Sequence, residues 1–336
     1  MDALLFLLGS FANQLQSPTL AFLIGGMALA AFGSKLSIPD AVYRFIIFML
    51  LMSVGLHGGI EIRDADIGQL ALPALFAAVI GCAAVLLGAA TLGRLPKVKS
   101  EDALATAGLF GAVSASTLAA AMVALEEEQI AFEAWAPALY PFMDIPALIL
   151  AIVLAGLHAR KTSGGKKGDL TVRRIVVDSL RSSALSALLL GMAIGFLVQP
   201  VDLYEGFYDL LFRGFLSVLM LVMGMEAWSR LSELKQVAQW FAAYALIAPI
   251  IHGLIAFGLG YIAHITVGFS PGGIVILAVI AASNSDISGP PTLRAGIPAA
   301  NPSAYIAAST SVGTPIAIAV CIPLFIALAQ LVFGLS

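Results

Sequence analysis

The sequence predicts an all-α membrane protein with ten transmembrane helices, built as two inverted repeats of five, in which broken helices cross at mid-membrane. Three observations predict this class. Of 336 residues, 60% are hydrophobic and 11% are charged, and the mean hydropathy is +1.00, unlike a soluble domain. Apolar runs long enough to span hydrocarbon recur along the chain. The two halves of the chain also match each other at a constant offset.

The apolar runs follow one another with little chain between them. Each is close to the ~20 residues that cross a bilayer as a helix. We expect spans at residues 17–33, 42–60, 67–93, 103–125, 136–158, 180–199, 207–228, 236–264, 273–295 and 303–333. Residues 2–12 are apolar but short, so we expect them at the membrane interface. No sizeable soluble domain remains.

The basic residues indicate the orientation. With both termini outside, 15 of the 17 Lys and Arg residues fall in inner loops, and only Arg63 and Arg213 lie outside, in keeping with the positive-inside rule. We interpret the basic runs as topology signals rather than as docking sites. Because no basic domain lies outside the spans, nucleic-acid binding is not expected.

The longest polar stretch divides the chain into two halves. Residues 159–179 contain Gly, Ser and Lys and predict a flexible cytoplasmic linker. Residues 1–158 then form the first repeat of five spans, and residues 180–336 form the second. Because five is odd, the second copy must run through the membrane in the opposite sense.

An offset of 169 residues aligns the halves. It pairs Gly55 with Gly224, Ala74 with Ala243, Ser114 with Ser283, Ser116 with Ser285, and Pro146 with Pro315. Inverted repeats are typical of secondary transporters, whose sites lie at the membrane midplane where interrupted helices meet. The alignment therefore predicts that spans four and nine approach each other there.

Polar residues interrupt both of these spans, at residues 111–117 and 281–291. Pro290 and Pro291 should break the second helix, because proline lacks an N–H. Half-helix N-termini carry unpaired N–H groups and partial positive charge, which suit a small anion. The alternative is that the small residues only allow close helix packing. The expected anion-binding residues are Gly111, Ser114, Ala115, Ser116, Thr117, Ser283, Asn284 and Ser285.

Two acids, Asp286 and Asp144, lie well inside spans and would be costly if ionised without a partner. No Lys or Arg lies at their depth, so a cation is the natural partner. Sodium prefers carboxylate, hydroxyl and carbonyl oxygens. Either acid could instead be protonated and hydrogen-bonded, and for Asp144 structural capping is an equal alternative. The expected sodium ligands are Asp286, Asp144, Ser116, Asn284 and Ser288.

Three stretches, residues 108–117, 140–146 and 294–302, resemble the sodium-dependent bicarbonate permease family (SbtA-like bicarbonate transporters). The resemblance implies a homotrimer in the inner membrane of a bacterium, with bicarbonate held between the broken helices. It also implies a core domain (spans 3–5 and 8–10) that moves against a gate domain (spans 1–2 and 6–7). A cytosolic PII-like regulatory trimer often accompanies this family. Asn284 and Asp286 depart from the more apolar neighbours expected in span nine.

The expected function is therefore sodium-coupled bicarbonate symport by alternating access, with Na⁺ as the only cofactor and no enzymatic activity. The alternatives are a sodium/proton antiporter and a sodium-coupled carrier of another small anion. A remote alternative is an intramembrane aspartyl protease, because two membrane acids could share a proton. The contexts Phe-Met-Asp-Ile and Asn-Ser-Asp-Ile lack the glycine-aspartate signature of such enzymes.

Overall fold

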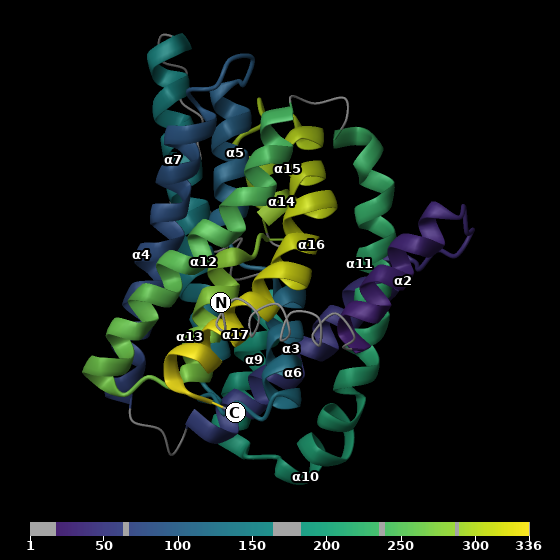
Figure 1. Cartoon of the computed structure of the whole chain (residues 1–336), viewed down its shortest axis with the longest axis vertical. Coiled ribbons are helices and arrows are strands. Elements are labelled where there is room, and N and C mark those ends of the chain that lie inside the picture. The colour runs from purple at the N-terminus through teal and green to yellow at the C-terminus, as the bar shows by residue number, and fades with distance from the viewer. Residues whose placement is uncertain (1–17, 63–66, 164–182, 235–238, 286–288, 336) are drawn as a thin grey trace.

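The computed structural model describes residues 18–62, 67–163, 183–234, 239–285 and 289–335. Within these ranges all regular structure is helical (Figure 1). The helices are α2 (Pro18–Ala31), α3 (Asp40–Ile62), α4 (Ile67–Leu92), α5 (Ser100–Gly111), α6 (Ala115–Glu127), η1 (Ala136–Ala138), α7 (Leu139–Ser163), α9 (Ser183–Val198), α10 (Val201–Leu203), η2 (Tyr204–Asp209), α11 (Leu210–Leu234), α12 (Gln239–Val267), α13 (Pro271–Ala282), α14 (Gly289–Gly296), α15 (Pro302–Ala308), η3 (Ser309–Gly313), α16 (Thr314–Ile316), η4 (Ala317–Cys321) and α17 (Ile322–Phe333).

Seven helical segments in the described ranges are long and apolar enough to cross a membrane. They are Asp40–Ile60, Gly68–Leu92, Ser100–Glu127, Ala136–Ala159, Val201–Leu231, Gln239–Val267 and Pro302–Phe333. The prediction of an all-α, multi-pass membrane protein is thus confirmed. Three shorter apolar helices overlap the other expected spans, 17–33, 180–199 and 273–295: they are Pro18–Ala31, Ser186–Val198 and Pro271–Ala282.

Both expected helix breaks are present. The fourth predicted span is two helices, α5 and α6, separated by residues 112–114. The ninth predicted span is also divided: its first helix, α13, ends at Ala282, and its second helix, α14, begins at Gly289. The break lies ahead of Pro290 and Pro291 instead of at them, because the two prolines occupy the first turn of α14, where a missing N–H costs nothing.

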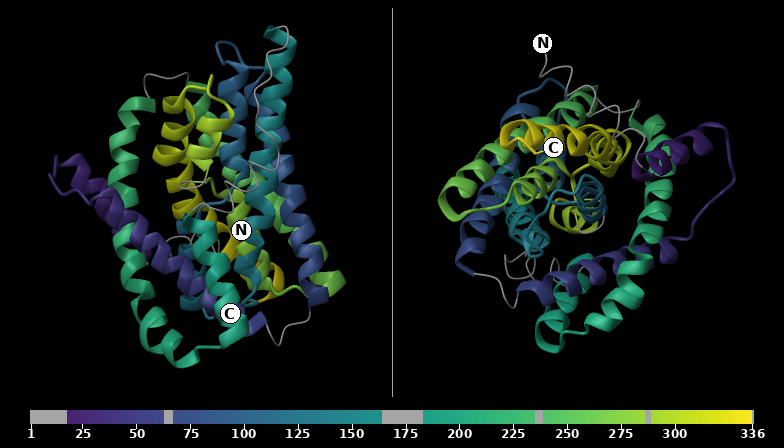
Figure 2. Two further views of the ribbon diagram at one scale, coloured as in Figure 1. Left: turned by 180° about the vertical axis from the view of Figure 1, so that it is seen from behind. Right: turned by 60° about the horizontal axis from the view of Figure 1, so that its bottom comes forward.

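Two pairs of helices cross very closely on one side of the molecule. The pair α2 and α11 lies away from α4 and α7 (Figures 1 and 2). A Cβ at Gly224 would lie 2.0 Å from the Leu23 carbonyl oxygen, and one at Gly26 would lie 2.1 Å from that of Leu221. In the pair α3 and α9, a Cβ at Gly55 would lie 2.2 Å from the Leu188 oxygen. Only glycine allows backbones to approach this far.

A second group, formed by α4, α5, α7, α12 and α13, packs around the two breaks. Its buried core includes every residue of α13 from Gly272 to Ala282. In α6, every residue from Ala115 to Leu125 is likewise buried. Because α6 and α13 are surrounded by other helices on all sides, neither one turns a polar face to lipid.

The last span contains π-helical turns at η3 and η4. The Thr314 N–H donates to the Ser309 carbonyl, five residues back. Pro315 follows immediately and cannot donate to the Ser311 carbonyl, which removes an α-helical hydrogen bond at this point. The proline thus accounts for the wide turn.

Candidate functional site

The two breaks meet in the interior. The Ser114 N–H donates to Ser283 Oγ at 2.9 Å. The Ser285 N–H donates to the Leu109 carbonyl at 2.9 Å. The first pair lies 169 residues apart, which is the offset that aligns the two halves. Spans four and nine therefore touch at two positions that the 169-residue offset pairs.

The N-terminus of α6 is built around Ser114. Its Oγ accepts hydrogen bonds from the Thr117 N–H at 3.1 Å and from Thr117 Oγ1 at 3.0 Å. Ser116 Oγ lies 2.8 Å from the same atom. Ser114 is thus the N-cap of the half-helix. Three hydroxyl groups gather at the positive end of a helix dipole, an arrangement that favours negative charge.

A serine hydroxyl also accepts a backbone N–H at the second break. Ser285 Oγ accepts a hydrogen bond from the Gly289 N–H at 2.8 Å, at the start of α14. Ser283 Oγ donates to the Ile280 carbonyl at 2.7 Å. This hydroxyl therefore joins the end of α13 to the Ser114 backbone. Asp286 and Ser288, the other residues expected here, lie outside the described residues.

Asn284 lies between these two serines, and its carboxamide is only half satisfied. Oδ1 accepts hydrogen bonds from the Ser309 hydroxyl and, at 2.9 Å, from Thr314 Oγ1. Nδ2 is buried and has no hydrogen-bond partner among the described residues. A buried donor left unpaired is rare and points to a ligand or a strained site.

None of the polar side chains that the structure describes at the breaks reaches solvent. The relative exposure is 0% for Ser114, Ser116, Thr117, Ser283 and Asn284, and 1% for Ser285. Gly111 and Ala115, the remaining expected anion-binding residues, end α5 and begin α6 and are also buried. Buried hydroxyls and amides are costly unless they are hydrogen-bonded, and most of these are bonded to one another.

Asp144, on α7, is also 0% exposed. Its Oδ1 accepts a hydrogen bond from the Val113 N–H at 3.0 Å, so the carboxyl group binds the backbone of the first break. The capping alternative for Asp144 is therefore present. A carboxylate has room for further partners, so this contact is compatible with a role as a sodium ligand. The described part of the chain holds no group of three or more His, Cys, Asp or Glu residues able to bind a metal ion.

His252, on α12, contacts the other end of the first break. It is 3% exposed, and its ring packs edge-on against Tyr244, with centroids 6.4 Å apart. Tyr244 stacks edge-on against the Phe110 ring, with centroids 5.3 Å apart. The histidine is thus a buried residue packed beside Tyr244, and its Nδ1 has no hydrogen-bond partner among the described residues.

Two acids near the ends of the spans were not foreseen as structural residues. Glu133 accepts hydrogen bonds from the Ser270 N–H at 2.6 Å and from Ser270 Oγ at 2.7 Å, at the N-cap of α13. Asp102 accepts one from the Asn301 N–H at 2.6 Å, at the N-cap of α15. We call these two contacts the carboxylate clamps. Each joins segments from opposite halves of the chain.

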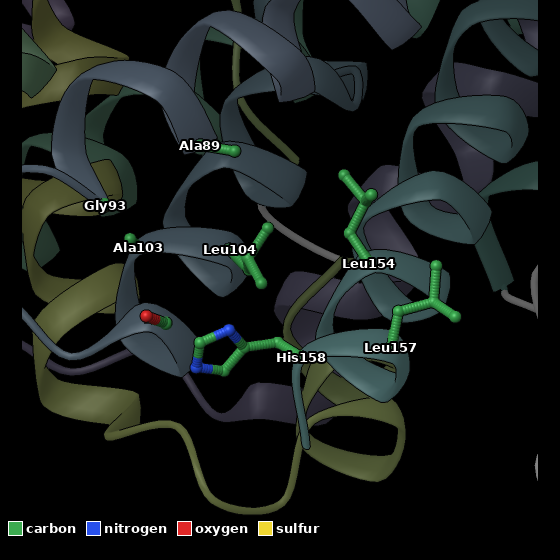
Figure 3. Close-up of a pocket in the computed structure, with 8 residues that line it drawn as sticks. Ala89, Gly93, Ala103, Leu104, Leu154, Leu157 and His158 are labelled. Carbon is green, nitrogen blue, oxygen red and sulfur yellow. The ribbon is translucent and has the colours of Figure 1, made fainter. Parts of the chain in front are cut away.

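A cavity of ≈ 330 Å³ lies away from the breaks, between α4, α5 and α7 (Figure 3). Its lining includes Ala89, Leu104, Leu154 and His158 and none of the expected site residues. The structure therefore gathers the candidate site at the breaks, among hydrogen-bonded side chains, and not in this cavity.

The chain was compared with known proteins. The family model described as the Na⁺-dependent bicarbonate transporter superfamily matches residues 18–330, so the match includes both halves of the chain and both breaks. A search of curated proteins gave no match.

Proposed function

The chain belongs to the Na⁺-dependent bicarbonate transporter superfamily, and on this premise we propose that it is a sodium-coupled bicarbonate symporter that works by alternating access. The family is one of transporters, so the chain is a transporter and not an enzyme. It is a multi-pass membrane protein, and its family implies sodium and bicarbonate as transported ions.

The observation that carries the proposal is the contact between the two breaks, the Ser114 N–H to Ser283 Oγ hydrogen bond. It supports a single anion site assembled from both halves, at the N-terminus of α6. Helix N-termini and hydroxyl donors bind small oxyanions without a formal positive charge. Bicarbonate would be held by Gly111, Ser114, Ala115, Ser116, Thr117, Ser283, Asn284 and Ser285.

Sodium would bind beside the anion, with Asp286, Asp144, Ser116, Asn284 and Ser288 as ligands. The buried hydroxyls and the Asp144 carboxyl group are of the oxygen type that sodium prefers. Without the cation, a carboxylate at low dielectric repels bicarbonate, because Coulomb energy is weakly screened there. Coupling then follows from charge, since each ion makes the site favourable for the other.

The proposed architecture is the two inverted repeats, residues 1–158 and 180–336, joined by the linker 159–179. The glycine contacts support it, because the offset of 169 pairs Gly26 with Gly195 and Gly55 with Gly224. Each of these four glycines lies against the backbone of a neighbouring helix. The gate domain would comprise α2, α3, α9 and α11, and the core domain would comprise α4–α7 and α12–α17.

The assembly is proposed from the resemblance and from the loop charges. We expect a homotrimer in the inner membrane of a bacterium, embedded in lipid and with both termini outside. A PII-like regulatory trimer would dock on the cytosolic side. Size determination in detergent and a pull-down with a PII-like protein would check these two interactions.

Uptake of labelled bicarbonate into proteoliposomes tests the function. An inward sodium gradient should drive accumulation, and its collapse with a sodium ionophore should stop it. Sodium-driven proton movement without bicarbonate would indicate the antiporter alternative. If the proteoliposomes take up a different small carboxylate and no bicarbonate, the protein would be a sodium-coupled carrier of that other anion. Sodium-independent bicarbonate uptake would contradict the symport mechanism.

Replacing Asp286 with Asn tests the coupling. The amide removes the charge that we assign to sodium binding, so Asp286→Asn should abolish the dependence of bicarbonate uptake on the sodium gradient. The matched control is Asp202→Asn, an exposed acid at the start of α10, which should transport like the unmodified protein. Unchanged sodium-driven uptake in Asp286→Asn would remove this residue from the mechanism.

A further inference from the structure

Ser309 and Thr314 reach the same oxygen atom of Asn284 because of the π-helical turn between them. In an α-helix, residues five apart lie about 140° apart around the axis. The wider turn of η3 brings such residues close to one face. The Thr314 N–H to Ser309 carbonyl bond shows that the turn is closed over five residues. Both hydroxyls can therefore donate to Asn284 Oδ1.

This contact decides which end of the carboxamide is left for a ligand. With Oδ1 occupied by two hydroxyl donors, Asn284 presents its buried Nδ2, which no described residue hydrogen-bonds. An N–H group binds an acceptor such as an anion, and it cannot coordinate a cation. The orientation of the amide is thus the feature that separates a role in anion binding from one in sodium binding.

Gly313 makes room for this NH₂ group. A Cβ at this position would lie 2.8 Å from Asn284 Nδ2 and 2.6 Å from the Phe110 ring. In the 169-residue alignment, Gly313 corresponds to Asp144. The first half thus carries a carboxyl group at the position where the second half leaves space for an amide. The two breaks are chemically different at this point despite their similar caps.

On the basis of the proposed function, we propose that Ser309 and Thr314 are positioning residues that orient Asn284 so that its NH₂ group serves the anion. Asn284 then supplies a donor to bicarbonate and no oxygen to sodium, so it leaves the proposed set of sodium ligands, which is reduced to Asp286, Asp144, Ser116 and Ser288. Neither hydroxyl touches a transported ion. Their effect passes through the amide, which would otherwise be able to rotate and present its oxygen.

The test measures two quantities for each variant in proteoliposomes: the KM for bicarbonate and the KM for sodium. Thr314→Val removes one of the two donors that hold Oδ1 and should raise the KM for bicarbonate about threefold to tenfold. The KM for sodium should stay unchanged. Thr314→Ser keeps the hydroxyl and should restore the original value. Ser309→Ala should act in the same direction as Thr314→Val, and it carries the test if that variant does not fold.

Ser311→Ala is the matched control. Ser311 is buried on the same turn, but its hydroxyl donates to the Ala307 carbonyl of its own helix. Its loss should leave both KM values unchanged. A double-mutant cycle then tests whether Thr314 acts through Asn284. Asn284→Ala should raise the KM for bicarbonate, and adding Thr314→Val to it should change that value by less than about twofold.

Three results would overturn the proposal. A rise in the KM for sodium alone would make the Asn284 oxygen a sodium ligand. An undiminished effect of Thr314→Val in the Asn284→Ala background would show that Thr314 acts independently of Asn284. Failure of Thr314→Ser to restore uptake would indicate a packing role. If the unmodified protein shows no sodium-driven bicarbonate uptake, the proposed function itself fails and this proposal fails with it.

Discussion

Single hydroxyl groups join the two breaks. Ser283 Oγ accepts the Ser114 N–H and donates to the Ile280 carbonyl, so one atom closes the end of α13 and binds the start of α6. A serine hydroxyl suits this position because it is both a donor and an acceptor. An apolar side chain of the same size would leave a buried N–H without a partner.

Ser283→Ala should therefore destabilise the protein by about 1–3 kcal/mol, the cost of a buried unsatisfied amide. Thermal unfolding in detergent should show a lower midpoint. The control is Ser217→Ala, because this exposed hydroxyl bonds the Gly214 carbonyl within its own helix. Equal midpoints for the two variants would contradict a structural role for Ser283.

The serines at the breaks could be predicted from the sequence, because hydroxyls in the middle of an apolar run need a reason to be there. Their partners could not be predicted with the same ease. The contact of Asp144 with the Val113 N–H depends on how α7 packs against the first break. The bonds from Ser309 and Thr314 to Asn284 depend on a π-helical turn that no periodicity of the sequence reveals.

At the scale of elements, the carboxylate clamps fix where two helices begin. Glu133 holds the N-cap of α13, and Asp102 holds that of α15. In each case a negative charge lies at a helix N-terminus, where it is favourable. The sequence does not predict the Glu133 contact, because it joins residues 137 positions apart and becomes visible only when the topology is known.

Glu133→Gln removes the charge and one of the two acceptor oxygens. It should lower stability by about 1.5–3 kcal/mol, as expected for hydrogen bonds to a charged group. Unfolding followed by the loss of helical circular dichroism would measure this. Glu128→Gln is the comparison, since Glu128 is exposed and bonds the Gln330 side chain at the surface. A midpoint equal to that of Glu128→Gln would show that the clamp is not needed.

The close helix crossings lead to a second prediction for the elements. Gly224→Val should prevent α11 from packing on α2, because even a Cβ there would lie 2.0 Å from the Leu23 oxygen. We expect loss of folded protein in size-exclusion chromatography. Gly214→Val, on the same helix but with nothing within 4 Å of its Cβ position, should leave the elution profile intact. The reverse outcome would exclude the crossing as a determinant of the fold.

At the scale of the whole molecule, one exposed ion pair connects the two proposed domains. Arg213, on α11, contacts Glu126 at 3.1 Å and Glu127 at 3.3 Å, both on α6. The pair joins the proposed gate domain to the proposed core domain. If one domain moves against the other during transport, this contact must break and form again in each cycle.

Arg213→Gln should therefore change the maximal rate of uptake while leaving both KM values near their original level. The effect should be at most about fivefold, because exposed pairs contribute up to about 1 kcal/mol, and it should shrink in high salt. The control is Arg44→Gln, whose partner Asp40 lies on the same helix. Uptake rates at two ionic strengths, with sodium held constant, would measure this. An equal change in both variants would exclude an interdomain role.

The burial of the described break residues has a consequence for the selectivity of the proposed anion site. An ion held there has exchanged its hydration shell for amide and hydroxyl dipoles, and dehydration becomes more costly as charge increases. The free energy of dehydration would be far larger for a divalent oxyanion such as sulfate than for a singly charged one. Discrimination by valence thus arises from enclosure alone, ahead of any fit between the ion and the groups around it.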